Sequence, residues 1–154
     1  DEAVMTAVRD KTSTYAHGIR FHVQSGMLFI HLPSGRNLCY QSPHFTENRF
    51  GNDAIGYYAP NAAGQRVVQE TFGGKLAENA TQAIARDILA HALLTLEKNG
   101  YPVIFHVHDE AVIEMSIGQG ALEEACRLMA IAPNWAEELP LRADGYECMY
   151  YRKD

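Results

Sequence analysis

The sequence has few cysteines, no long apolar run and no excess of basic residues. Cys39, Cys126 and Cys148 are an odd number without close spacing, which argues against a disulfide framework and against a zinc site built from cysteines. No apolar run is long enough to span a bilayer, and no charged-then-apolar leader opens the chain. These absences predict a cytoplasmic protein with no membrane partner.

Basic residues are also scarce relative to acidic ones. With 13 Lys and Arg against 19 Asp and Glu, the net charge of −6 argues against a protein that holds nucleic acid by a general positive field. Any contact with DNA must therefore be local. The hydrophobic content of 47% and the length of 154 residues are those of a globular chain with one core. We expect a single domain over residues 1–154.

Hydrophobic periodicity predicts an α+β fold, in which an antiparallel sheet packs against one long helix and several shorter ones. The long helix is expected over residues 75–99, and shorter helices over residues 1–9 and 120–130. Strands are expected over residues 18–23, 27–32, 37–40, 54–58, 66–72 and 141–150. Residues 42–64, which are rich in Asn, Gly and Pro, are expected to form an irregular insert that holds only one of these strands.

Residues 101–115 are predicted to form two short apolar strands joined by a turn at His108-Asp109-Glu110. The turn has no glycine, although short hairpin loops usually need one, and such departures from turn chemistry mark functional positions. Neighbouring carboxylates repel each other, so Asp109 and Glu110 are tolerable in water, beside basic groups or around a cation. A solvated turn is the plain alternative, and a bound cation is our leading hypothesis.

The long helix carries a polar stripe. Its four members follow helical spacing: Lys75, Asn79, Gln82 and Arg86. Basic side chains suit phosphates, and amides carry both the donor and the acceptor needed at minor-groove base edges. Much of the remaining helix surface is apolar, which predicts that the stripe faces a cleft. A solvated helix face is again the alternative.

Three segments of the chain carry a recognisable pattern: Leu32-Pro-Ser-Gly-Arg-Asn-Leu-Cys-Tyr40, Gly73-Gly-Lys-Leu-Ala-Glu-Asn-Ala-Thr-Gln-Ala-Ile-Ala-Arg-Asp87 and Val107-His-Asp-Glu110. Together they resemble the C-terminal palm region of family A DNA polymerases, most closely those of bacteriophages. The resemblance implies template-directed nucleotidyl transfer in DNA replication, with Mg²⁺ as cofactor. It covers nearly the whole chain.

The resemblance also implies roles for individual residues. Asp109 would be a catalytic Mg²⁺ ligand, Glu110 a further ligand or a neighbour of one, and His108 would hold the primer end. Lys75, Asn79 and Gln82 would contact the primer-template duplex, and we extend that role to Arg86 because it continues the stripe. Asn79 and Gln82 are three positions apart, whereas cellular members of the family have a spacing of four.

Two motifs of such polymerases do not occur in this chain: a strand with another metal-binding aspartate, and a helix whose Arg, Lys and Tyr handle the incoming nucleotide. We therefore expect half of a two-metal site and an isolated chain without polymerase activity. DNA and deoxynucleoside triphosphates would be partners through the complete enzyme, together with the missing upstream segment. An exposed apolar patch would favour a homo-oligomer.

Two other classes of function are compatible with the residues. A metal-dependent hydrolase could use His106, His108 and Asp109, because a His-x-His pair can bind Zn²⁺. The chain could also be a non-catalytic interaction module, such as a prophage remnant or one half of a split enzyme.

Overall fold

The computed structural model describes residues 2–48 and 50–152. It has two compact units, Asp1–Ile84 and Ala85–Asp154, and the boundary between them falls within the long helix α2 (Gly73–Lys98). An antiparallel six-stranded sheet and three α-helices confirm the predicted α+β class. None of the helices among these residues is long and apolar enough to cross a membrane.

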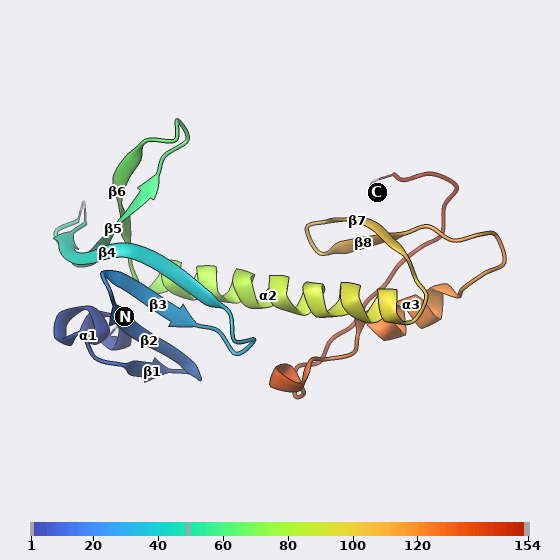
Figure 1. Cartoon of the computed structure of the whole chain (residues 1–154), viewed down its shortest axis with the longest axis horizontal. Coiled ribbons are helices and arrows are strands. Elements are labelled where there is room, and N and C mark those ends of the chain that lie inside the picture. The colour runs from blue at the N-terminus through green and yellow to red at the C-terminus, as the bar shows by residue number, and fades with distance from the viewer. Residues whose placement is uncertain (1, 49, 153–154) are drawn as a thin grey trace. The chain divides into compact units, whose positions relative to one another are not determined.

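The first unit begins with helix α1 (Glu2–Asp10) and continues as a meander of antiparallel strands (Figure 1). The strands are β1 (Thr14–Ala16), β2 (Ile19–Gln24), β3 (Met27–His31), β4 (Asn37–Glu47), β5 (Asp53–Pro60) and β6 (Arg66–Thr71). Each strand pairs with the next one along the chain, so the spatial order is the sequence order. Short connections suffice for this topology because antiparallel neighbours need no crossover.

The core of this unit lies against one face of the sheet, which we call the inner face. Alternation along β3 places Leu28 and Ile30 on it, while Phe29 points to the opposite, outer face. Helix α1 and the first half of α2 supply the covering residues. The buried cluster comprises Val4, Val8, Leu28, Ile30, Leu32, Tyr40, Ile55, Leu76, Ala80 and Ala83.

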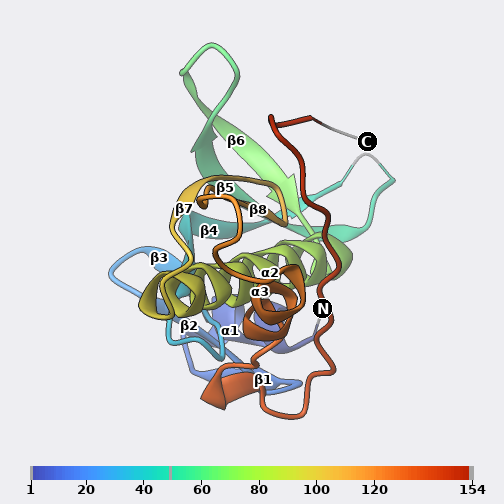
Figure 2. The same ribbon diagram turned by 90° about the vertical axis from the view of Figure 1, so that its right-hand side faces the viewer.

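The prediction of an irregular insert over residues 42–64 is wrong. Strand β4 runs on to Glu47, and β5 and β6 form a hairpin that extends from the sheet (Figure 2). The register shifts between Gln41 and His44, and Ser42 has a φ of 51° there. This irregularity accommodates Pro43, which cannot donate to a strand ladder, and the strand resumes beyond it.

The second unit holds the remainder of α2, the hairpin β7 (Val103–Val107) and β8 (Glu110–Ile113), helix α3 (Leu122–Met129) and the 3-10 turn η1 (Asn134–Ala136). Its buried cluster is Leu96, Tyr101, Ala125 and Leu128, with Val103, Ala111, Ile113, Met115 and Met129 packed around it. The helices expected over residues 75–99 and 120–130 are therefore confirmed within two residues at each end.

The closing strand expected over residues 141–150 is wrong, because the described residues from 141 to 152 contain no strand. Apolar residues alternate over residues 141–150, but neither set of alternate side chains is buried. Met149 is 83% exposed and Tyr150 is 72% exposed. Alternating apolar residues form a strand only where a neighbouring strand pairs with them and one face is covered.

Candidate metal centre and nucleic-acid interface

The β7–β8 hairpin ends in a two-residue loop, His108 and Asp109, between the paired residues Val107 and Glu110. His108 takes a φ of 52°, in the left-handed region that short hairpin loops require and that glycine or asparagine usually supplies. His108, Asp109 and Glu110 are all exposed. The hairpin thus presents two adjacent carboxylates and one imidazole at its tip, as the sequence predicted.

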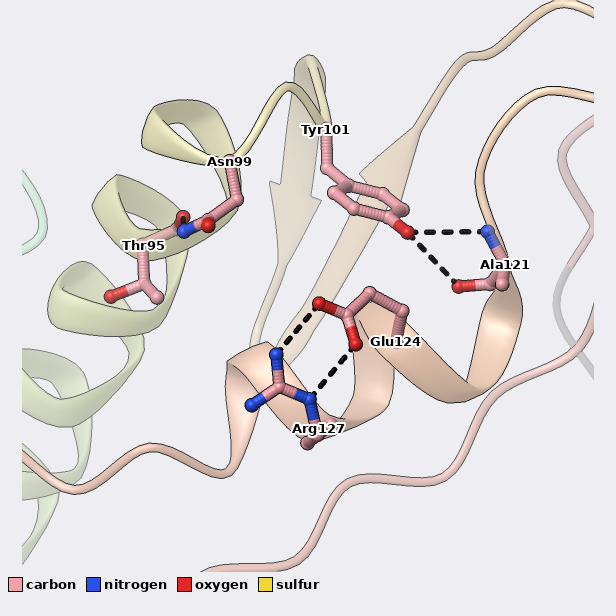
Figure 3. Close-up of polar contacts among 6 residues, drawn as sticks. All are labelled: Thr95, Asn99, Tyr101, Ala121, Glu124 and Arg127. Atoms are coloured by element: carbon pink, nitrogen blue, oxygen red, sulfur yellow. Dashed lines mark hydrogen bonds and ion pairs between the residues drawn. The ribbon is translucent and has the colours of Figure 1, made fainter.

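Packing at the base of the hairpin holds this tip. Tyr101, just before β7, is buried, and its hydroxyl accepts a hydrogen bond from the backbone N–H of Ala121 at 3.2 Å (Figure 3). The same hydroxyl lies 3.4 Å from the carbonyl oxygen of Ala121. These contacts fasten the start of β7 to the residue that precedes α3. The exposed ion pair of Glu124 and Arg127 on α3 lies on the surface of the same region.

The two tip carboxylates have no salt-bridge partner within the described part of the chain. Carboxylate oxygens are the donors that Mg²⁺ prefers, and Mg²⁺ usually takes only one or two of them from a protein. Asp109 and Glu110 therefore fit such an ion by their chemistry. Residues 2–48 and 50–152 contain no group of three or more His, Cys, Asp or Glu side chains placed to hold a metal ion.

That finding argues against the zinc hydrolase alternative, which needs His106, His108 and Asp109 together. His106 is engaged elsewhere, because its Nε2 lies 3.1 Å from Nη2 of Arg86 on α2. Arginine can only donate, so Nε2 of His106 accepts and its proton is on Nδ1. His106 is an exposed residue of β7.

On α2, Lys75 and Gln82 are exposed and both contact one carboxylate, that of Glu78. Nζ of Lys75 lies 3.1 Å from Oε2 of Glu78, and Nε2 of Gln82 donates to Oε1 at 3.3 Å. Both contacts join residues about one helical turn apart, because side chains three or four positions apart are neighbours on a helix surface. Glu78 was not predicted as part of this surface, although it lies three positions from Lys75 and four from Gln82 in the sequence.

Asn79 differs from these neighbours because it is half-buried. Its amide Nδ2 donates to the hydroxyl of Tyr40 on β4 at 2.9 Å. The Tyr40 ring meets the Tyr57 ring edge-on at 4.9 Å, and burial raises the pKa of the Tyr40 hydroxyl. Tyr40 therefore fixes the direction of the Asn79 amide. No local sequence signal links residues 39 positions apart, which is why the sequence did not reveal this pair.

The turn between β3 and β4 also touches α2, through Arg36 of the Leu-Pro-Ser-Gly-Arg string. Nη2 of Arg36 donates to the carbonyl oxygen of Ala83 at 2.9 Å. Gly35, with a φ of 87°, permits the turn that places Arg36 there. This part of the polymerase-like sequence therefore has a structural contact with the helix that carries the polar stripe.

The chain is 42% identical over 156 aligned residues to the DNA polymerase of Bacillus phage SP02. The alignment covers the whole of this chain but 24% of the phage protein. No protein-family model and no solved structure matches the chain. The sequence is therefore related along its entire length to one segment of a phage DNA polymerase.

Proposed function

We propose that this chain is the C-terminal palm portion of a family A DNA polymerase of the bacteriophage type. One observation carries the proposal. In a chain related throughout to a phage DNA polymerase, two exposed carboxylates without ion-pair partners among the described residues stand at a glycine-free hairpin tip. Such a tip is costly as a plain turn and suits the binding of a cation.

In this proposal Asp109 and Glu110 would hold Mg²⁺ at the growing end of the primer. Bound Mg²⁺ would lower the pKa of the attacking hydroxyl and offset the charge of the triphosphate. The hairpin supplies a rigid position for the two carboxylates, because its base is packed against the cluster around Leu96 and Tyr101. The imidazole of His108 contacts the primer end beside them.

Helix α2 supplies the contacts with the primer-template duplex. Lys75 and Arg86 neutralise phosphates, while the amides of Asn79 and Gln82 meet base edges in the minor groove. Asn79 is held by Tyr40, so its amide is oriented before DNA arrives. Other parts of a complete polymerase would supply the second aspartate and the nucleotide-binding helix, so the chain alone should not extend a primer.

The proposal can be tested by exchanging segments. The 154 residues replace the aligned segment of the SP02 polymerase, and the chimera is assayed for primer extension with Mg²⁺. We expect extension by the chimera. Asp109→Asn should reduce it on the order of 1,000-fold, because a metal ligand contributes several kcal/mol to stabilising transition-state charge.

Asp144→Asn is the matched control, since Asp144 is an exposed carboxylate of the same unit that pairs with Arg142. It should leave extension unchanged. Full activity of the Asp109→Asn chimera would contradict the catalytic assignment. Extension by the isolated chain would show that the parts regarded as missing are dispensable.

A further inference from the structure

The outer face of the sheet has an unusual composition near its first edge. Opposite pairs in the register place Arg20 beside both Tyr15 and His31, and place Phe29 beside both His22 and Cys39. Residues opposite each other share a face of the sheet. We call the following residues the outer-face patch: Tyr15, Arg20, His22, Phe29, His31 and Asn37.

Three rings of the patch form a stack across β2 and β3. The ring of His22 is stacked with that of Phe29 at 5.0 Å between centroids and with that of His31 at 4.6 Å. Tyr15, on the neighbouring strand, is 68% exposed. The patch therefore offers the exposed ring of Tyr15 and the partly exposed ring of Phe29, beside basic groups.

Nitrogen atoms crowd at one end of the stack. Nε2 of His31 lies 2.8 Å from Nη2 of Arg20 and 2.7 Å from Nδ1 of His22. Arg20 can only donate, so Nε2 of His31 is an acceptor and the ring is neutral. Partial burial, the charge of Arg20 and the neighbouring His22 lower the pKa of His31, in that order, while a hydrogen bond with Asn37 opposes them.

Acidic residues are absent from this region. Residues 11–46 contain no Asp or Glu, whereas the whole chain has 19, and they include Lys11, Arg20 and Arg36. The titratable or charged groups on the outer face of β1 to β3 and the start of β4 are Tyr15, Arg20, His22, His31 and Cys39. In a chain of net charge −6, a face with Arg20 and two imidazoles and without carboxylates is suited to a polyanion.

We propose that the outer-face patch binds single-stranded DNA, with Arg20 and the paired imidazoles on a phosphodiester and the Tyr15 and Phe29 rings against unpaired bases. Proteins that bind single strands combine basic groups with aromatic side chains in this way, and a duplex would withhold its bases from such rings. The site lies on the opposite face of the sheet from the core and from α1. It does not depend on the polymerase assignment or on the α2 stripe.

The site predicts coupling between DNA binding and protonation. A phosphate beside His31 stabilises the charged form of its ring, so the bound chain should take up a proton and affinity should rise as pH falls. For each proton taken up, the dissociation constant falls by at most about tenfold per pH unit. The affinity should change with pH in the range between the lowered pKa of His31 in the free chain and its higher pKa in the complex.

The test uses the full chain and an oligothymidylate of about 12 nucleotides. NMR follows the ring protons of the histidines, and fluorescence anisotropy gives the affinity at about pH 6 and about pH 8. We expect the His22 and His31 signals to shift on binding and the pKa of His31 to rise. Arg20→Gln and Tyr15→Ala should each weaken binding about fivefold or more. Arg142→Gln, an exposed arginine outside the patch, should not.

Unmoved His22 and His31 signals at saturating oligonucleotide would overturn the proposal, and this measurement on the unaltered chain decides even if a variant fails to fold. Equal or tighter binding of a blunt duplex would overturn the assignment to single strands. Lys75→Gln on α2 should leave the histidine shifts intact. Failure of the patch therefore leaves the polymerase proposal standing, and failure of the chimera leaves the patch standing.

Discussion

The two units of the chain differ in how their polar groups are used. In the first unit, polar side chains contact the members of the cluster of ten buried residues: Asn79 donates to the Tyr40 hydroxyl, and Arg36 donates to the backbone carbonyl of Ala83. In the second, the buried cluster has four members, and the tip carboxylates of the hairpin extend into solvent without ion pairs in the described chain. The first unit therefore orients a polar side chain of α2 through its packed sheet, whereas the second unit presents two carboxylates at a hairpin tip without an ion-pair partner in the described chain.

Truncations of buried leucines should give the largest losses of unfolding free energy. They should also test whether the two units unfold independently. Leu28 and Leu96 are both fully buried, one in each cluster, so Leu28→Ala and Leu96→Ala should each cost about 3 kcal/mol. Trp135 is the single tryptophan and lies in the second unit, so its fluorescence during denaturation reports that unit. Hydrogen exchange of the β3 and β4 amides reports the first.

If the units unfold independently, each substitution shifts the transition of its own unit. Equal shifts of both transitions by either substitution would mean that the chain unfolds as one cooperative domain. That outcome would support the single domain expected from length and composition. The difference between the two units would then describe the folded chain and not its unfolding.

Tyr40→Phe should have an intermediate effect. It removes the hydroxyl that orients Asn79 and leaves a half-buried amide without that partner, which should cost about 1 kcal/mol of unfolding free energy. In the SP02 chimera, the same change should weaken primer-template binding, and combining it with Asn79→Ala should add little. Tyr15→Phe, at an exposed ring, should alter stability by less than about 0.5 kcal/mol. Additive losses of affinity would argue against positioning through Tyr40.

Acid should weaken the first unit through His31. The pKa of His31 is lower in the folded chain than its ordinary value near 6.5, so the unfolded chain binds the proton more readily. Stability should therefore decrease as pH falls from about 6.5 toward the lowered pKa, and this contribution should be complete above the ordinary value. Denaturation at several pH values measures the slope. His31→Gln should flatten it, and an unchanged slope would assign the acid sensitivity to other groups.

The smallest change in stability should come from Glu78→Gln. The carboxylate is about half exposed and pairs with Lys75 within one turn, so the loss should stay below about 0.5 kcal/mol. Its effect on DNA binding should have the opposite sign. Removing the negative charge frees Lys75 for a phosphate, and the chimera should bind primer-template more tightly. Weaker binding would show that Glu78 aligns Lys75 and Gln82 instead of competing with DNA.

The sequence predicted those features that depend on local pattern. Helix α2, strands β2 and β3, and the hairpin around His108 follow from periodicity and from a recognisable motif. The extension of β4 was missed because Pro43 and the following Asn and Gly residues signal a loop, whereas the bulge at Ser42 lets the ladder continue. Composition alone does not reveal a bulge.

Contacts between residues far apart in the sequence could not be predicted from local pattern, as the residues of α2 illustrate. Spacing placed Lys75, Asn79 and Gln82 on one stripe but gave no information about Tyr40, whose contact with Asn79 depends on how β4 packs against the helix. The outer-face patch could have been anticipated in part. Arg20-x-His22 and Phe29-x-His31 alternate in neighbouring predicted strands, and only the register between them was needed to place all four together.

The left-handed backbone of His108 has a consequence for the hairpin as a folding element. A side chain other than glycine or asparagine in this conformation costs about 1 kcal/mol, so His108→Gly should let β7 and β8 pair more readily. With histidine at this position the turn is less favourable, but an imidazole lies next to Asp109. An engineered chain with glycine there would be easier to fold and would lack the ring.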